Sequence, residues 1–304
     1  MINEIELLAS YWTAAGDVEP MGPDEVSPHS FRERAEIVGA AGFHGFGTIL
    51  ADVQRAEATI GYREMRRVLA GSGIKYVELE FLVDWYADGK RRSHSDKTRR
   101  DLLAAADALG ARDIKIGPDF DTPTADIPRM QGCFADLCRD AAKYGADIAI
   151  EMMPWSNVRT IETARAIVEG ADQPNGGIVL DIWHLARGGI AYDQIKTIPP
   201  RFIRSVEIDD AAASAVGSLV EDTIHRRLFP GAGALNPPAF INAIQATGWR
   251  GCYGVEILSS VYRKWPIKEV VQEAFDSTMR QFEKARHQCA EQEDAQQKLR
   301  GYIS

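Results

Sequence analysis

The stretch KYGADIAIEMMPW (Lys143–Trp155) contains the end of a predicted helix, a glycine turn and a short strand. Gly145 is the residue type that most readily ends a helix in the left-handed conformation. Side chains alternate along the strand segment DIAIE, so Ile148 and Ile150 share one face and Glu151 lies on the other. A helix that leads directly into such a strand is typical of a parallel sheet.

This unit recurs along the whole chain. We expect strands near Glu6–Ser10, Gly45–Ile49, Tyr76–Phe81, Asp113–Gly117, Asp147–Met152, Gly177–Asp181, Phe202–Ile208 and Cys252–Ile257. The predicted helices are Phe31–Ala41, Tyr62–Ser72, Asp96–Leu109, Ile127–Tyr144, Thr160–Glu169, Tyr192–Ile198, Pro237–Thr247 and Ile267–Arg286. Glycines that end helices before the next strand are Gly42, Gly73, Gly110, Gly145 and Gly248.

Eight strand–helix pairs predict an α/β fold, a single (β/α)8 TIM barrel with a parallel eight-stranded core, over residues 1–286. The polar residues 287–304 are expected to form a C-terminal helical tail and no separate domain. A doubly wound open sheet is the alternative. Its dinucleotide-binding form is disfavoured because no GxGxxG follows the first strand.

The composition excludes several classes of protein. The chain has 304 residues, with 35 Lys and Arg against 44 Asp and Glu, and a formal net charge of −9. A hydrophobic content of 45% excludes a disordered chain. No apolar run reaches the ~18–20 residues that a transmembrane helix needs. An acidic surface repels phosphate groups, so we expect neither nucleic acid nor a membrane as a partner.

The cysteines show neither metal-binding spacing nor the density of a disulfide framework, so we expect free, buried thiols. They are Cys133, Cys138, Cys252 and Cys289. The N-terminal MINEIELLAS lacks the basic and apolar regions of a signal peptide. Both observations predict a cytoplasmic protein.

The same alternation points four carboxylates into the barrel, each at the C-terminal side of a strand. They are Glu151, Asp181, Glu207 and Glu256, on the fifth to eighth predicted strands. Converging carboxylates repel one another in a medium of low dielectric constant unless they are neutralised. Protonation or Lys and Arg partners would neutralise them, and a divalent cation would do so most completely. Oxygen ligands favour Mg²⁺ or Mn²⁺.

The motifs AIEMMPW, GIVLDIWHLARGG, RSVEIDD and YGVEI, which carry these carboxylates, resemble the xylose isomerase-like TIM-barrel superfamily of sugar phosphate isomerases and epimerases. The resemblance implies that Glu151, Asp181, Glu207 and Glu256 hold a divalent metal. It also implies that Glu151 and Glu256 exchange a proton with the substrate carbon. The position of Glu207 is usually histidine in the epimerases, so this site favours Mn²⁺ or Mg²⁺, with Zn²⁺ or Co²⁺ as alternatives, or a site balanced by Arg or Lys.

Residues near the predicted metal supply candidate substrate contacts. His184 follows Asp181 by three residues and matches the family's D-x-x-H pattern. Arg227 lies in the long segment 211–235, where an R-x-x-P-G-x-G pattern resembles the family's substrate-side loop. Lys115 points inward, either to polarise a substrate oxygen or to neutralise Glu78 and Glu80. Trp155 follows the fifth strand and is a candidate for an apolar wall.

These observations predict a metal-dependent sugar or polyol isomerase or epimerase of carbohydrate metabolism. It would work through a metal-stabilised enediolate with paired glutamates. A dehydratase or lyase acting on a keto-sugar, keto-cyclitol or dehydroshikimate-like substrate at the same site is the alternative, and a non-catalytic binding barrel is a further one. The expected partner is a small sugar, keto-sugar or polyol, and the chain is a candidate homo-oligomer.

Overall fold

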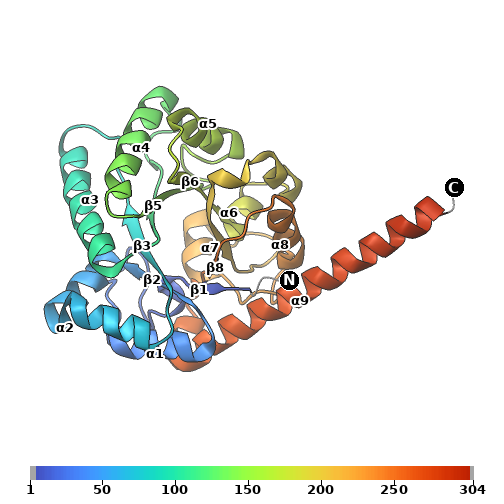
Figure 1. The fold of residues 1–304 in the computed structure, drawn as a ribbon, viewed down its shortest axis with the longest axis horizontal. Helices are drawn as coiled ribbons and strands as arrows, with labels where there is room; N and C mark the ends of the chain where they lie inside the picture. The colour runs from blue at the N-terminus through green and yellow to red at the C-terminus, as the bar shows by residue number, and fades with distance from the viewer. Residues whose placement is uncertain (1–4, 302–304) are drawn as a thin grey trace.

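The strands close into a parallel barrel in which each strand pairs with its neighbours in sequence order and β1 pairs with β8 (Figure 1). This computed structural model describes residues 5–301. The strands are β1 (Leu7–Ala9), β2 (Gly45–Ile49), β3 (Tyr76–Leu82), β4 (Asp113–Ile116), β5 (Asp147–Glu151), β6 (Gly176–Asp181), β7 (Ile203–Ile208) and β8 (Tyr253–Val255). The predicted TIM barrel is therefore confirmed.

Helices surround the barrel and bury the outward-facing apolar side chains of the strands. They are α1 (Phe31–Ala41), α2 (Leu50–Gly71), α3 (Gly89–Leu109), α4 (Ile127–Ala142), α5 (Ile161–Ala171), α6 (Ile182–Arg187), α7 (Leu219–His225), α8 (Pro237–Ala246) and α9 (Ile267–Gly301). Gly42 ends α1 with φ of 107°, and a Cβ there would lie 2.7 Å from the ring of Phe275. Only glycine satisfies both constraints.

Two helices begin earlier than the sequence predicts. α2 starts at Leu50 instead of Tyr62 and is interrupted at Gly61, whose φ of 75° breaks the helical conformation. α3 starts at Gly89, so the expected start at Asp96 is wrong. Ser95 lies inside α3 and donates a hydrogen bond to the Val83 carbonyl at 2.6 Å. The first turns of α3 are polar, so no apolar periodicity marks them.

Two other segments also differ from their expected form. The expected helix Tyr192–Ile198 is a 3-10 helix over Tyr192–Thr197. The segment 211–235 contains α7, which begins with a capping box between Ser218 and Glu221. A short α7 of seven residues within a long loop has too few apolar positions to give a periodic signal.

Helix α9 packs against α1 and α8 and then continues away from the barrel (Figure 1). It reaches Gly301, so the predicted tail is helical as far as residue 301. Residues 302–304 of that tail lie outside the described residues. The absence of a separate domain in the tail stays a prediction. Within the described part of the chain, no helix has the length and apolar composition to cross a membrane.

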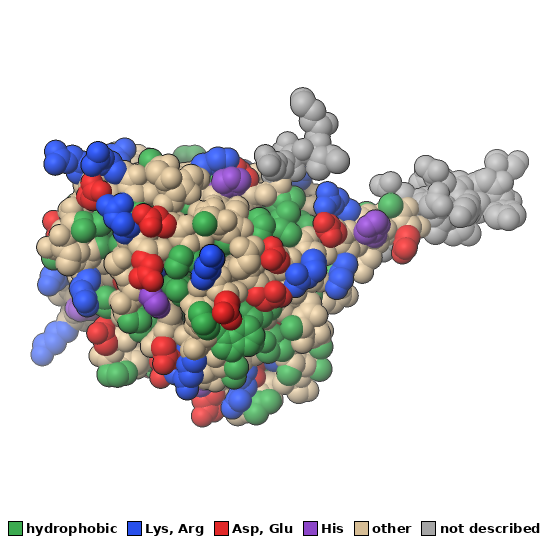
Figure 2. Space-filling view, turned by 90° about the horizontal axis from the view of Figure 1, so that it is seen from below, with side chains coloured by type: hydrophobic (Ala, Val, Ile, Leu, Met, Phe, Trp, Pro, Cys, Tyr) green, Lys and Arg blue, Asp and Glu red, His purple; other side chains and the backbone are tan. Residues whose placement is uncertain are grey.

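The molecular surface carries charges of both signs. Figure 2 shows Lys and Arg side chains interspersed with Asp and Glu over the visible face of the described residues. The formal charge of −9 is therefore not gathered into one broad acidic region on this face. Part of the acidic excess lies inside the barrel, because several carboxylates there are buried.

The cysteines divide into two pairs by burial. All four are free thiols, but only Cys138 and Cys252 are buried. Cys133 and Cys289 are partly exposed, so the expectation of burial is wrong for them, because each lies on a helix that borders solvent. Burial raises the pKa of both Cys138 and Cys252 to about 12, so their reactive thiolate forms are rare at neutral pH.

Iodoacetamide at pH 8 is therefore expected to alkylate Cys133 and Cys289 in the native protein and to spare Cys138 and Cys252. Unfolding in urea should make all four react, because it removes the burial that suppresses the thiolate. Peptide mass spectrometry measures both states. Native labelling of Cys252 at the rate of Cys133 would contradict the buried environment of Cys252.

Candidate active site

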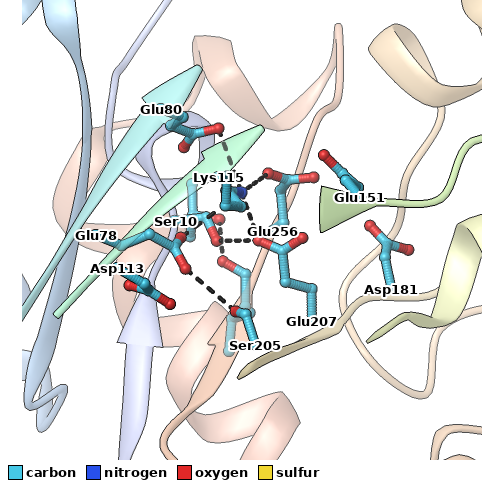
Figure 3. A network of polar contacts seen from close by, with 12 residues as sticks. Ser10, Glu78, Glu80, Asp113, Lys115, Glu151, Asp181, Ser205, Glu207 and Glu256 are labelled. Carbon is cyan, nitrogen blue, oxygen red and sulfur yellow. Dashed lines mark hydrogen bonds and ion pairs between the residues drawn. The ribbon is translucent and has the colours of Figure 1, made fainter. Parts of the chain in front are cut away.

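The barrel brings the four predicted carboxylates together at the C-terminal ends of its strands (Figure 3). Glu151 ends β5, Asp181 ends β6, Glu207 lies on β7 and Glu256 directly follows β8. One oxygen from each lies within 4.8 Å of the others, and all four side chains are buried. We call these four residues the carboxylate cluster.

Asp181 has two structural tasks besides its place in the cluster. Its Oδ1 accepts hydrogen bonds from the backbone N–H groups of Trp183 at 2.6 Å and His184 at 3.1 Å, which caps the start of α6. Its Oδ2 accepts from Arg227 at 2.6 Å. Burial acts to raise the pKa of Asp181, but Arg227 and His184 outweigh burial and lower it. The D-x-x-H spacing thus fixes His184 on the first turn of a helix.

His184 lies against both Glu151 and an aromatic wall. Its Nε2 is 3.1 Å from Glu151 Oε1 and 3.9 Å from Asp181 Oδ2. The rings of His184 and Trp155 are 5.6 Å apart between centroids. Burial acts to raise the pKa of Glu151, and the hydrogen bond and charge of His184 reverse this effect and lower it. Glu151 is therefore held in its ionised form.

Lys115 lies at the centre of the buried acidic groups (Figure 3). Its Nζ is 2.7 Å from Glu207, 3.2 Å from Glu80, 3.2 Å from Glu256 and 3.6 Å from Glu78. The Lys115 side chain is buried and does not line the cavity at this end of the barrel. Of the two alternatives for Lys115, this geometry favours neutralisation of the carboxylates over contact with substrate.

Glu207 is the most enclosed member of the carboxylate cluster. Its Oε1 accepts hydrogen bonds from Lys115 at 2.7 Å and from Ser10 at 3.1 Å. Its Oε2 is buried and has no hydrogen-bond partner among the described residues. Burial and the neighbouring Glu256 raise the pKa of Glu207 well above its usual value. A bound cation would satisfy a buried carboxylate oxygen of this kind, which has no hydrogen-bond partner.

Arg227 is buried and bridges several carboxylates. Its Nη1 is 2.6 Å from Asp181 Oδ2 and 3.2 Å from Glu256 Oε2, and it also donates to Asp209. Its Nη2 donates to Thr223 Oγ1 at 2.9 Å. Arg227, a predicted substrate contact, therefore lines the cavity, but most of its N–H groups bind other side chains of the protein.

Two acidic neighbours of Glu207 had no predicted role. Asp209 is buried against Arg227, and burial is the main cause that raises the pKa of Asp209 well above its usual value. Asp210 accepts hydrogen bonds from the backbone N–H groups of Ala211, Gly231 and Leu235, each at 2.9 Å, and so fixes both ends of the long loop. The alternation that turns Glu207 inward also turns Asp209 inward, so a sequence signal existed.

A cavity of about 670 Å³ opens above the carboxylate cluster. Its polar lining includes Glu80, Glu151, His184, Arg227 and Glu256. Its other lining residues are mostly apolar and are Trp12, Pro20, Met21, Glu25, Ile49, Leu50, Ala51, Phe81, Val83, Phe120, Met153, Trp155, Val220, Thr223, Ile224 and Leu258. The cavity is at the end of the barrel where TIM-barrel enzymes bind their substrates.

The residues present fit a divalent metal ion. The buried acidic side chains outnumber the permanent cations Lys115 and Arg227 around them. The carboxylate cluster offers four oxygen ligands, and Glu207 Oε2 lacks any other partner among the described residues. Oxygen ligands of this number suit Mg²⁺ or Mn²⁺. The second grouping that meets the same geometry combines Glu151, Asp181 and His184.

Comparison with known proteins agrees with this architecture. The profile of the xylose isomerase-like TIM barrel family matches residues 32–281. The chain belongs to this family. A 3-dehydroshikimate dehydratase from Pseudomonas aeruginosa is 27% identical over 265 residues, which cover 86% of this chain and 41% of that protein. An inosose isomerase from Bacillus subtilis is 30% identical over 146 residues, which cover 47% of this chain and 51% of that protein.

The matched regions thus span about half of these relatives or less, and both relatives are named as enzymes, a dehydratase and an isomerase. Among solved structures, the IOLI protein with a bound zinc atom has a TM-score of 0.79 at 21% identity, covering 92% of this chain and 99% of that chain. A fusion of a xylose isomerase-like TIM barrel with a 4-hydroxyphenylpyruvate dioxygenase has a TM-score of 0.81 at 23% identity, covering 95% of this chain and 44% of that chain. These two structures share the fold of this chain.

Proposed function

We propose that this chain is a divalent-metal-dependent isomerase or epimerase of a keto-sugar or cyclitol. The observation that carries the proposal is the convergence of Glu151 and Glu256 at the floor of one cavity, with Asp181 and Glu207 directly beneath them. All four carboxylates are assigned as metal ligands, with Mn²⁺ or Mg²⁺ as the preferred ion. When bound, the cation stabilises the negative charge that develops on substrate oxygens next to the reacting carbon.

The side chains at the floor divide the remaining tasks. Glu151 ends β5, Glu256 follows β8, and both reach the cavity, so one removes a proton from the carbon and the other returns a proton. His184 orients Glu151 and presents its ring to a substrate hydroxyl. Arg227 holds Asp181 and Glu256 in place. Trp155 forms part of the apolar wall.

A dehydratase is the second candidate. It is favoured by the similarity to 3-dehydroshikimate dehydratase, which extends over 86% of this chain, against 47% for the inosose isomerase. In this reaction a glutamate takes the proton beside the carbonyl, and the electrons of that C–H bond form a carbon–carbon double bond. The neighbouring C–O bond breaks, and the leaving hydroxyl accepts a proton and departs as water. The pair His184 and Glu151 lies where it can deliver that proton.

Incubation with inosose and with 3-dehydroshikimate in D₂O distinguishes the two reactions. Deuterium in a recovered substrate or its isomer supports the isomerase, and a product lighter by one water supports the dehydratase. We expect treatment with a chelator to abolish either reaction, and added Mn²⁺ or Mg²⁺ to restore it, because the buried carboxylates lose their neutralising cation. Mass spectrometry follows the substrate, and elemental analysis follows the metal.

A protein that binds no metal and exchanges no deuterium with either substrate would contradict both reactions. That result would favour the non-catalytic barrel. Retention of full activity after the metal is removed would contradict the metal assignment alone.

A further inference from the structure

The cavity has a polar floor and an apolar wall, and the two are separate. At the floor, Glu80 and Glu256 contact Lys115, and Glu151 and Glu256 belong to the carboxylate cluster (Figure 3). Above them the wall is built from side chains such as Ile49, Leu50, Phe81, Val83 and Leu258. A polyhydroxylated sugar carries hydroxyl groups around its whole ring. A wall of this kind offers such hydroxyls few partners in place of water.

Two polar side chains of the wall already form hydrogen bonds within the protein. Glu25 Oε1 accepts a hydrogen bond from the Met21 backbone N–H at 2.6 Å. Thr223 Oγ1 accepts from Arg227 at 2.9 Å. Both side chains line the cavity, and one oxygen of each is bound within the protein. The part of a ligand that lies along the wall is therefore best matched by an apolar group.

A row of aromatic rings leads from the rim of the cavity to its floor. Phe120 and Trp155 are nearly parallel, with 23° between their planes and 6.3 Å between centroids. Trp155 in turn lies 5.6 Å from the ring of His184. The loops that carry Phe120 and Trp155 are tied together, because Asp119 and Asn157 exchange two hydrogen bonds of 3.1 Å. This aromatic row is thus fixed before a ligand arrives, which lowers the entropic cost of binding.

We infer that the substrate carries a planar apolar group attached to its oxygen-rich reacting part, for example an aryl-substituted keto-sugar or cyclitol. The inference rests on the proposed function, which places the reacting part at the floor. A cavity of about 670 Å³ is several times larger than a monosaccharide needs and is in the range that encloses drug-sized ligands. Phe120 keeps 45% of its surface exposed, so it has free surface to offer a planar ring.

Two simple glycosides test this inference. Phenyl β-D-glucopyranoside and methyl β-D-glucopyranoside share the sugar and differ in the apolar group. Titration calorimetry of the Mn²⁺-loaded protein is expected to give at least about tenfold tighter binding of the phenyl compound, as expected for burial of an aromatic ring. In the Phe120→Ala variant this preference should fall by about threefold or more.

Tyr144→Ala is the matched control. Tyr144 is an aromatic residue with 41% of its surface exposed, and it precedes β5, at the opposite end of the barrel from the cavity. It should leave the preference unchanged. Equal affinities for the two glycosides, no binding of either, or a preference that Phe120→Ala does not reduce would each overturn the inference. Deuterium exchange with inosose or 3-dehydroshikimate needs no aryl group, so it tests the proposed function separately.

Discussion

Replacement of Glu256 by glutamine is expected to slow proton exchange at the substrate carbon by about 10²- to 10⁴-fold. Glutamine keeps the shape of the side chain but neither accepts a proton nor carries the charge that attracts a metal ion. Glu256 lines the cavity and is 3.2 Å from both Lys115 and Arg227. The amide keeps contact with one of these cations through its oxygen, so the fold should persist while the chemistry is lost.

Glu151→Gln should produce a loss of similar size, because the proposal places one glutamate on each side of the reacting carbon. Deuterium incorporation from D₂O, measured by mass spectrometry at saturating metal, separates the chemical defect from weaker metal binding. Glu25→Gln is the matched control, since Glu25 lines the same cavity but its carboxylate binds the Met21 backbone. A metal-loaded Glu256→Gln or Glu151→Gln variant that exchanged deuterium at the normal rate would contradict the assignment.

The barrel and its inward carboxylates were predictable because strand alternation is a local rule. In DIAIE and GIVLD the isoleucines and leucine identify the outer face, and Glu151 and Asp181 are then on the inner face whatever surrounds them. The starts of α2 and α3 were not predictable in the same way. The first turns of α3 are rich in polar residues, and its start depends on tertiary contacts such as that of Ser95 with Val83. In α2 the non-helical Gly61 separates two helical stretches, and the sequence pattern marked only the second.

The partners of the long basic side chains could be predicted only in part. Alternation places Lys115 inside the barrel, and the expected partners Glu78 and Glu80 are 3.6 and 3.2 Å from its ammonium. Its contacts with Glu207 and Glu256 depend on the closure of the barrel, which brings β4 close to β7 and β8. Arg227 comes from a long loop without periodic signal, and only the folded structure places its guanidinium against Asp181 and Asp209.

Lys115→Met is expected to destabilise the protein by about 3–5 kcal/mol, because it leaves buried carboxylates without their cation. The Lys115 ammonium is buried and is 2.7 Å from Glu207. Lys143→Met is the matched control. Its ammonium is also 2.7 Å from a carboxylate, that of Asp140, but the Lys143 side chain is 66% exposed. Loss of that surface pair should cost less than about 1 kcal/mol. Urea unfolding of the metal-free protein measures both.

Lys115→Met should also change how the stability of the protein depends on pH. Burial raises the pKa of Glu80 from 4.5 to about 8, and Lys115 opposes this rise. Between pH 4.5 and about 8, Glu80 holds a proton in the folded state that it has lost in the unfolded chain. The stability of the metal-free protein therefore falls as pH increases. Removal of Lys115 raises the pKa further. The variant should therefore lose stability over a wider pH range than the wild type and continue to lose it above pH 8.

Lys115→Met combined with Glu207→Gln distinguishes a charge effect from a packing effect. If Lys115 stabilises the barrel by neutralising Glu207, the double variant should recover about 1–3 kcal/mol relative to Lys115→Met alone. Lys115 and Glu207 would then act as a charge-balanced buried pair. A double variant no more stable than Lys115→Met would mean that the methylene stem of Lys115, and not its charge, supports the barrel.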